Sequence, residues 1–396
     1  MENILGSCRV NVRVLCLTCV LFLSVFITQT YAAPAQKVTL VLGGPHNVTL
    51  VSLYAAEGLG FFTQEGIDLS VEPSQGTGDS AGYLAAGKAD FAVTSPDALM
   101  ITVSKGVDAL SIFTWFQGEL NKLVVLDDSP IKQVGDLKGK VVGVALLGSV
   151  NYYVLLRELK LAGMNEDSVK MVPLGMGLGQ VEPLFEHKVD ALMASSVGTL
   201  LYLSQTRGIK VRFIPLQGKP VPSLVIATTL ATVNAKRDIA VSVGRAFAKG
   251  IAYYEANSSA AVDIMAKVHP ELVPDLNLAR FNAQWATGVV VLEEDKKYPI
   301  GWHDPEIWSY TQQLYQELGI IPKGVNAQKC YTNDLMSGIN DFDRLAIEHM
   351  AQPIPVQRET RVWDASLETI TLVCLGLLVL TVAALVIHKR RRRTNS

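Results

Sequence analysis

The sequence has few cysteines, and this shortage excludes two kinds of small-protein scaffold. Five cysteines occur in 396 residues; three lie within the first 19 residues and Cys374 lies in an apolar run near the C-terminus. Only Cys330 is left for the long central part. The sequence therefore has no disulfide framework and no cysteine-based metal site.

Charge is also scarce and is unevenly distributed. Charged residues make up 18% of the chain, and 49% of the residues are hydrophobic. This composition is too apolar for a disordered protein, and the chain is long enough for two packed lobes. Without the seven basic residues of the two ends (35 − 7 = 28) and the acidic Glu2 (37 − 1 = 36), the central part has a net charge of −8. Because the central part is acidic overall and only the C-terminal tip is basic, we expect no nucleic acid partner.

Both ends of the chain carry apolar runs. Residues 1–35 have a weakly cationic start, an uncharged core and small residues after it, which is typical of a signal peptide; an uncleaved anchor is the alternative. Residues 370–387 are uncharged and would span about 27 Å as a helix, and five consecutive basic residues follow at 389–393. We expect a transmembrane helix at 369–388 and a cytoplasmic tail at 389–396. The protein would then be single-pass in the cell membrane, with its main part extracellular or periplasmic.

Between the ends, short β-branched runs alternate with helical patterns, which is typical of α/β layers. After Lys236 the pattern is mostly helical, and residues 350–368 predict a linker. The expected strands are 38–42, 68–71, 91–94, 110–114, 122–126, 141–144, 169–172, 191–194 and 211–215. The expected helices include 49–57, 80–86, 98–105, 149–161, 181–186, 196–206, 237–256 and 305–317.

One sequence pattern occurs twice, at 83–95 and 184–195. Each copy has a helical stretch, the sequence x-Lys-x-Asp ending at Asp90 or Asp190, a buried strand and a serine before the next helix. Two copies predict two similar lobes, although βα units can resemble one another by chance. We expect lobe 1 at 36–123 and 223–349 and lobe 2 at 124–222, with two crossings that form a hinge and a ligand cleft between the lobes.

The motifs of several large enzyme classes are missing. The sequence has no Walker loop, no Rossmann fingerprint, no H-E-x-x-H and no nucleophile elbow. The six histidines are scattered, so we expect neither a metal site nor a cofactor.

Small polar residues instead stand where expected strands end and helices begin. Each could be an ordinary helix N-cap. At the carboxyl ends of strands from two lobes they would meet in one crevice, where helix N–H groups favour polar or anionic ligand atoms. The turns concerned contain His46, Asn47, Thr77, Ser95, Asp97, Ser149 and Ser195.

Two aromatic and two acidic residues refine the expected site. Trp115 and Phe116 stand near the first crossing and either stack on a flat ligand or belong to the core. Asp97 and Glu119 favour a ligand with N–H donors or positive charge, because a buried carboxylate requires a partner. Either carboxylate could instead be a cap or a solvated residue.

The segment 53–71 (LYAAEGLGFFTQEGIDLSV), with 84–92 (LAAGKADFA), resembles solute-binding proteins of ABC importers for sulfonates, nitrate and thiamine pyrimidine precursors. Residues 128–143 and 245–253 are similar as well, and the likeness covers about 38–345. The resemblance implies an α/β, two-lobed periplasmic-binding-protein (type II) fold, to which this chain would add the C-terminal transmembrane helix. It implies ligand contacts at His46, Asn47, Thr77, Asp97, Trp115, Phe116, Ser149 and Ser195.

The resemblance also implies a function without catalysis. The chain would capture a small molecule, such as a thiamine pyrimidine precursor or another heteroaromatic, for an ABC permease and its ATPase. A sulfonate-, nitrate- or taurine-type anion is an alternative solute, although the expected cleft turns contain no Arg or Lys. Pyrimidine-forming enzymes share this fold but use a Cys-rich motif that is missing here; such an enzyme and an anchored sensor are further alternatives.

Overall fold

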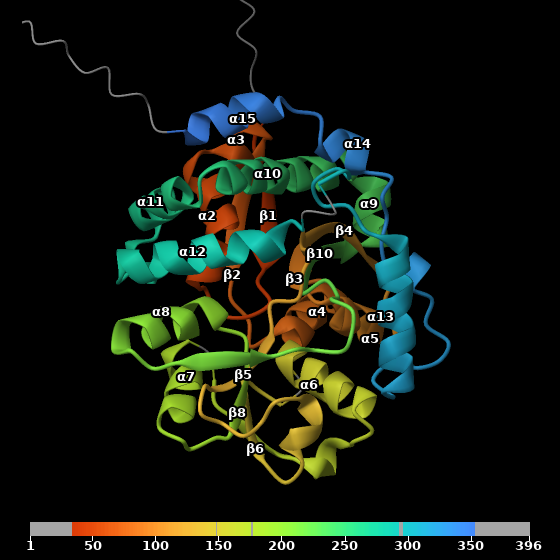
Figure 1. Ribbon diagram of the computed structural model, residues 1–396. Helices are drawn as coiled ribbons and strands as arrows, with labels where there is room; N and C mark the ends of the chain where they lie inside the picture. The colour runs from red at the N-terminus through yellow and green to blue at the C-terminus, as the bar shows by residue number, and fades with distance from the viewer. Residues whose placement is uncertain (1–33, 148, 176, 293–295, 353–396) are drawn as a thin grey trace, which may run out of the picture. The chain divides into compact units, whose positions relative to one another are not determined.

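The computed structural model describes residues 34–352 except 148, 176 and 293–295, and its strands form two five-stranded sheets (Figure 1). The expected signal region up to residue 33, and the linker, transmembrane helix and tail beyond residue 352, lie outside the described residues. Within the described part, no helix has both the length and the apolar character needed to cross a bilayer.

The first sheet, with the helices around it, forms lobe 1. Its strand order is β2–β1–β3–β10–β4, and β10 runs antiparallel to both of its neighbours. The strands are β1 (Gln36–Val41), β2 (Ile67–Glu72), β3 (Phe91–Thr94), β4 (Ala109–Phe116) and β10 (Leu224–Thr229).

The second sheet forms lobe 2 and repeats this plan. Its order is β7–β6–β8–β5–β9, and here β5 is the strand that runs antiparallel to its neighbours. The strands are β5 (Lys122–Leu126), β6 (Val141–Val144), β7 (Lys170–Pro173), β8 (Ala191–Ala194) and β9 (Val211–Ile214).

All nine expected strands are confirmed, with ends shifted by two residues at most, and β10 is an additional strand. The helices are α2 (Val51–Gly58), α3 (Phe61–Gln64), α4 (Thr77–Ala85), α5 (Pro96–Ser104), α6 (Val150–Leu161), α7 (Leu178–Phe185), α8 (Val197–Arg207), α9 (Leu230–Ala235), α10 (Arg237–Ala256), α11 (Ser258–Val268), α12 (Leu276–Val290), α13 (Pro305–Glu317), α14 (Met336–Ile339) and α15 (Arg344–Ala351). Short 3-10 turns include η1 (Val48–Leu50), η2 (Val134–Leu137), η3 (Glu166–Ser168), η4 (Pro270–Leu272) and η6 (Ala327–Lys329).

Both faces of the strands β3, β4 and β8 are buried, which explains why these strands do not alternate between apolar and polar residues as the edge strand β2 does. On β10, Ile226 packs with α2, α10, α11 and α12, whereas Val225 and Ala227 point to the opposite core with α4, α5 and α13. On β5, Leu123 and Val125 pack toward α6, and Val124 and Leu126 pack toward α7 and α8. Figure 1 shows the helices on the two sides of each sheet.

The repeated sequence pattern has the same structure in both lobes. The Asp90 carboxylate accepts a hydrogen bond from the Thr39 N–H at 2.9 Å, and the Asp190 carboxylate accepts one from the Val141 N–H at 2.8 Å. Each aspartate thus ties the start of β3 or β8 to the neighbouring strand. The turn before it needs a positive φ, supplied by Gly87 (66°) in lobe 1 and by His187 (55°) in lobe 2. Chance similarity does not explain this agreement.

The chain crosses between the sheets twice. The first crossing runs from the end of β4 at Phe116 to the start of β5 at Lys122, and the second runs from Ile214 to Leu224. The two crossings lie against each other, because the Ser223 hydroxyl donates to the Gly118 carbonyl (2.8 Å) and accepts from the Leu120 N–H (3.1 Å).

Candidate functional site

In lobe 1 the structure brings together three of the expected site residues. Thr77 begins α4, Ser95 immediately precedes α5, and Asp97 lies in the first turn of α5. The Ser95 hydroxyl donates to the Thr77 hydroxyl at 3.0 Å, which joins the two turns. The Ser95 side chain does not cap α5, so its placement is not that of an ordinary N-cap.

Asp97 is the most unusual of these residues. It is only 3% exposed, and its Oδ1 has no hydrogen-bond partner among the described residues. Burial raises the pKa of the Asp97 carboxyl, and hydrogen bonds from Ser95 and from backbone N–H groups act in the opposite direction. Since a buried polar atom without a partner costs about 1–3 kcal/mol, this oxygen is suited to a ligand that donates a hydrogen bond.

The charge of Asp97 acts on two tyrosines, one from each lobe. Tyr153, on α6 of lobe 2, packs against the lobe 1 cluster that contains Tyr315 of α13, with ring centroids 6.5 Å apart at 81°. Burial and then the charge of Asp97 raise the pKa of both phenols. The tyrosines were not expected from the sequence, because they lie on helices with no recognisable motif.

In lobe 2 the expected serines lie at the carboxyl ends of strands. The Ser195 N–H and hydroxyl both donate to the Gln180 Oε1 at 3.0 Å, and the Ser149 hydroxyl donates to the Leu146 carbonyl at 2.5 Å. Gln180 is fully buried, and its Nε2 has no partner among the described residues. This glutamine was missed by the sequence analysis. A polar residue on the buried side of α7 was the available signal.

The His46 turn faces a different group of side chains. His46 Nδ1 lies 2.8 Å from the Tyr54 hydroxyl, and the Tyr54 ring packs edge-on against His269. Asn47 is the N-cap of η1, and its side chain accepts from the Thr49 N–H at 3.0 Å. Trp115 and Phe116 are completely buried in the core of lobe 1, where the Trp115 indole N–H donates to the Ser52 hydroxyl at 2.9 Å. Neither ring presents a face to solvent.

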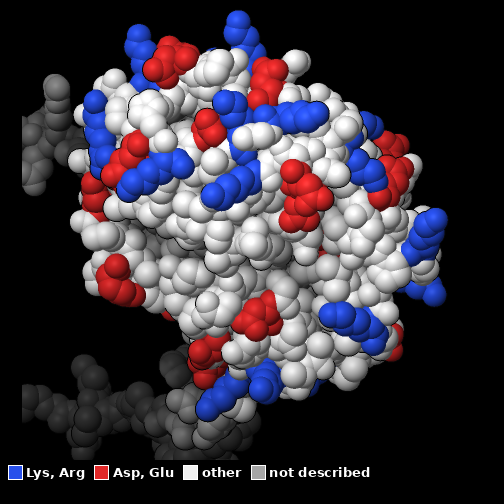
Figure 2. Space-filling model, turned by 90° about the horizontal axis from the view of Figure 1, so that it is seen from below, with Lys and Arg blue, Asp and Glu red and all other residues white. Residues whose placement is uncertain are grey.

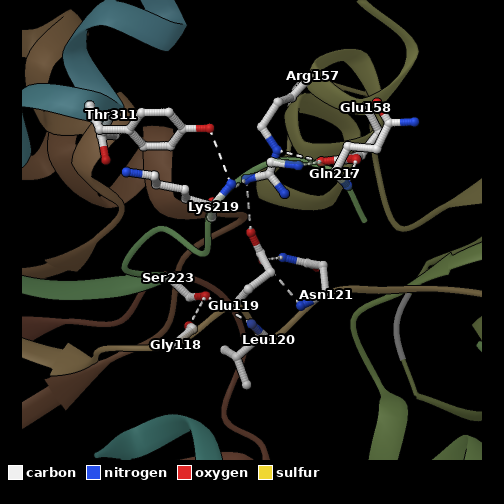
Figure 3. A network of polar contacts seen from close by, with 12 residues as sticks. Gly118, Glu119, Leu120, Asn121, Arg157, Glu158, Gln217, Lys219, Ser223 and Thr311 are labelled. Carbon is white, nitrogen blue, oxygen red and sulfur yellow. Dashed lines mark hydrogen bonds and ion pairs between the residues drawn. The ribbon is translucent and has the colours of Figure 1, made fainter. Parts of the chain in front are cut away.

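Glu119 lies in the first crossing, within a buried polar network (Figure 3). Its Oε1 accepts from the Asn121 side chain at 2.8 Å, and its Oε2 lies 3.4 Å from Arg157 Nη1. Arg157, on α6, also pairs with Glu158 at 2.7 Å. Two carboxylates thus pair with the guanidinium, whose Nη2 has no partner among the described residues.

The same network holds the second crossing. Glu158 accepts from the Gln217 N–H at 2.6 Å and from the Gly218 N–H at 3.2 Å, and the Lys219 N–H donates to the Tyr310 hydroxyl at 3.2 Å. The sequence analysis missed Arg157 and Glu158. The signal was a Glu at the position that follows Val154 by one helical turn, on the apolar side of α6.

A comparison with protein families identifies the chain. The model of the family described as "NMT1/THI5 like" matches residues 47–261, which is more than half of the sequence. The chain belongs to the NMT1/THI5 like family. The matched residues include both crossings and the strand-end turns of both lobes from Asn47 onward, but not His46.

Two of the four relatives that match this NMT1/THI5 like chain are named as binding proteins. The riboflavin-binding protein RibY of Chloroflexus aurantiacus is 25% identical over 78% of this chain and 90% of its own length. A formylaminopyrimidine-binding protein of Halalkalibacterium halodurans is 22% identical over 74% of this chain and 89% of its own length. One relative is named as an enzyme: 4-amino-5-hydroxymethyl-2-methylpyrimidine phosphate synthase of Legionella pneumophila, 28% identical over 36% of this chain and 45% of its own length.

Solved structures confirm the two-sheet periplasmic-binding-protein fold of this family member. The alkanesulfonate-binding protein SsuA from Xanthomonas axonopodis pv. citri, bound to MOPS, superposes with a TM-score of 0.58 at 16% identity. The superposition covers 76% of this chain and 99% of SsuA. At this identity the likeness concerns the fold and not the ligand.

This NMT1/THI5 like chain shows neither a patch of one charge sign on the face in Figure 2 nor a metal-binding cluster among its described residues. On the face shown in Figure 2, basic and acidic side chains are mixed rather than gathered by sign. No group of three or more His, Cys, Asp or Glu with the geometry of a metal site occurs in the described part of the chain. Cys330 is buried, and burial raises its pKa to about 11, so the thiol is protonated at neutral pH.

Proposed function

We propose that the protein is a non-catalytic solute-binding protein that captures a small heteroaromatic compound between its two lobes and delivers it to an ABC importer. This proposal depends chiefly on the environment of Asp97. Asp97 has a buried carboxyl group with an oxygen unpartnered among the described residues, in the first turn of α5 directly after β3. Membership of the NMT1/THI5 like family and relatives named for riboflavin and formylaminopyrimidine support a ring-shaped solute.

The charges of the described residues argue against an anionic solute. Arg157 is buried at the junction of the lobes; its Nη1 pairs with Glu119 and its Nε with Glu158, while its Nη2 has no partner among the described residues. An incoming sulfonate would compete for the Arg157 guanidinium with two carboxylates that are fixed in place. A buried charge without a counter-charge is strongly unfavourable.

The test is a binding assay with the full-length purified chain. The probes are 4-amino-5-hydroxymethyl-2-methylpyrimidine, riboflavin, ethanesulfonate and nitrate, each followed by thermal unfolding and by mass spectrometry of the recovered probe. A compound present at 100 times its Kd stabilises the folded state by about 2.7 kcal/mol. We expect one ring compound to raise the unfolding temperature and to be recovered unchanged. If none of the probes raised the unfolding temperature, a solute-binding role would be refuted.

A pyrimidine-forming enzyme is the second candidate, because one relative is named as a synthase. His46 is the residue to test, since its Nδ1 contacts the Tyr54 hydroxyl at 2.8 Å and its ring is partly exposed. Product formation by the purified chain that His46→Ala abolishes would favour the enzyme. Unchanged probe in the presence of the wild-type chain would favour the binding protein.

The membrane part of the proposal rests on the sequence. The apolar run at 370–387 and the five basic residues after it would anchor the receptor with its lobes outside the cytoplasm, at high local concentration for a permease. Proteolysis of intact and of lysed cells tests this topology. Lobes that are cleaved only after lysis would contradict it.

A further inference from the structure

We infer that α15, the last helix of lobe 1, lays its outer face against the phospholipid bilayer to which the chain is anchored. This inference rests on the membrane part of the proposed function and deepens it, because it assigns a lipid-contact surface and an orientation to the anchored receptor. The surface consists of Leu345, Ala346, His349 and Met350.

The outer face of α15 is apolar and exposed. Leu345 is 65% exposed, more than any other large hydrophobic side chain in the described part of the chain, and Met350 is 51% exposed. At about 100° per residue, Leu345, His349, Ala346 and Met350 occupy one arc of about 140°, and all four are exposed. Apolar surface gathered on one face in this way indicates a partner.

The inner face of α15 is already covered. Ile347 and Ala351 are buried in the core of lobe 1, and Arg344 and Glu348 lie between the two faces with 2.6 Å between their charged atoms. A helix that is apolar on two faces needs a partner for each of them. The core of lobe 1 supplies only the inner one.

The charges around α15 do not favour an anionic partner. Arg344 is paired with Glu348 and, at 3.4 Å, with Glu255 of α10. Asp341 and Asp343 are exposed in the turn that leads into the helix. Anionic lipids attract clusters of basic residues, and here acidic residues outnumber Arg344. We therefore expect the contact to depend on apolar side chains and to form on neutral phosphatidylcholine.

An aromatic pair lies beside the turn that leads into α15. Tyr298 and Trp302 stack at 5.4 Å and 11°, and Lys297 Nζ lies 4.9 Å from the centre of the Tyr298 ring. The Asn340 side chain binds both the N–H and the carbonyl of Ile300 at 3.0 Å, which fixes this loop next to α14. Tyr, Trp and Lys are the residue types that favour the headgroup level of a bilayer.

The position of the chain's exit makes the bilayer the nearest partner. The chain leaves α15 at Ala351, and 18 residues (369 − 351 = 18) separate it from the apolar run that begins at residue 370. They reach about 65 Å at most. A tether of this length gives an effective concentration of about millimolar, so a contact that is too weak to hold a free protein on a vesicle is populated here.

This contact would set a resting orientation. Figure 1 shows α15 at the end of lobe 1 that is opposite to lobe 2. With α15 on the bilayer, lobe 2 and the crossings point away from the membrane. Delivery of a solute to a permease would then require α15 to leave the lipid, with the tether as the pivot.

The experiment places the full-length chain, one copy per particle, in phosphatidylcholine nanodiscs that contain a lipid with a photoreactive diazirine near its glycerol. Mass spectrometry measures lipid adducts on the peptide that contains α15, and the rate at which hydrogen peroxide oxidises Met350. We expect Leu345→Glu to reduce the adducts at least 5-fold and to speed Met350 oxidation several-fold. The matched control is Leu161→Glu at the end of α6 in lobe 2, where Leu161 is 47% exposed; it should change neither.

Unfolding temperatures of the variants check that the fold is intact, and Ala346→Glu on the same face is the second variant. Adducts on α15 that are equal in wild type and in both variants, or absent from all of them, would overturn the lipid contact and leave the anchor and solute binding intact. Slow Met350 oxidation without adducts would also overturn it, because another part of the chain would then cover α15. A chain that does not stay with the nanodiscs would overturn the anchor and the contact together.

Discussion

Glu119, in the first crossing between the lobes, forms a buried ion pair with Arg157 on α6 of lobe 2, with 3.4 Å between Oε2 and Nη1. Both side chains are at most 3% exposed. Arg157 also holds Glu158, which accepts hydrogen bonds from the backbone of the second crossing at Gln217 and Gly218. Helix α6 therefore contacts both connections between the lobes, through Arg157 and Glu158.

Removal of the guanidinium is the first prediction. Arg157→Ala leaves Glu119 and Glu158 buried without their counter-charge, and we expect a loss of about 3–5 kcal/mol in the free energy of unfolding. Urea unfolding measures this loss. Arg207→Ala is the matched control, because Arg207 forms an exposed pair with Glu182 and should cost no more than about 1 kcal/mol. Equal losses of unfolding free energy in the two variants would show that the buried ion pairs stabilise the protein no more than an exposed pair does.

The second prediction concerns the contact between α8 of lobe 2 and α12 of lobe 1. A Cβ on Gly198 would lie 2.3 Å from the Asn282 Oδ1 and 2.9 Å from its Cα, so Gly198→Ala must push the two helices apart. We expect a stability loss of about 1–3 kcal/mol, the usual cost of overpacking, and weaker solute binding because the closed lobes no longer fit.

Small-angle scattering and calorimetry test this second prediction together. Gly288→Ala on α12 is the control, since an added Cβ there meets no atom within 4 Å and the residue is exposed. It should stabilise the helix by about 0.5–1 kcal/mol. A Gly198→Ala protein with wild-type dimensions and affinity would contradict the proposed closure.

The third prediction compares the two repeated aspartates. Asp90→Ala deprives the half-buried Thr39 N–H of its acceptor, and we expect it to cost about 1–3 kcal/mol. Asp190→Ala should cost less, because Asp190 is exposed and water can replace it at the Val141 N–H. Chemical denaturation of both variants measures the difference. The reverse order would show that exposure does not govern the energy of these bonds.

The fourth prediction concerns pH. His303 is fully buried between Ser111 and Asn333, and burial lowers its pKa to about 4. An unfolded histidine titrates near pH 6.5, so between these values the unfolded chain binds more protons and the folded state loses stability as the pH falls. The loss over this range is roughly 3 kcal/mol.

Unfolding free energies at several pH values between 4 and 7.5 test this effect. His303→Gln removes the titrating group, so the difference between wild type and variant isolates its contribution from that of the carboxylates. We expect the wild-type free energy to fall more steeply than that of the variant below pH 6.5. Parallel curves would contradict a neutral buried His303.

Much of the fold could be predicted because it depends on local patterns. Residues 91–94 and 191–194 were placed correctly from short apolar runs, and the repeat around Asp90 and Asp190 predicted two similar lobes. The strand β10 was missed, because it inserts between β3 and β4 from the second crossing, more than 100 residues away in the sequence. No local pattern specifies such a pairing.

The candidate site was predictable only in part. Polar residues at strand ends gave Thr77, Ser95 and Asp97, which the structure brings into neighbouring turns. The environment of Asp97 was not visible, since Tyr153 and Tyr315 come from other helices. Trp115 and Phe116 show the opposite problem: an aromatic pair has the same sequence whether it lines a cleft or fills a core.

The position of β10 also determines the order in which a growing chain can complete its parts. When the ribosome has made residue 214, every strand of the second sheet has been synthesised, but the first sheet still lacks the strand that joins β3 to β4. Lobe 1, whose first strand is synthesised before any strand of lobe 2, is therefore the last to be completed. Until residues 224–229 emerge, the free edges of β3 and β4 can be bound by chaperones or pair with another strand.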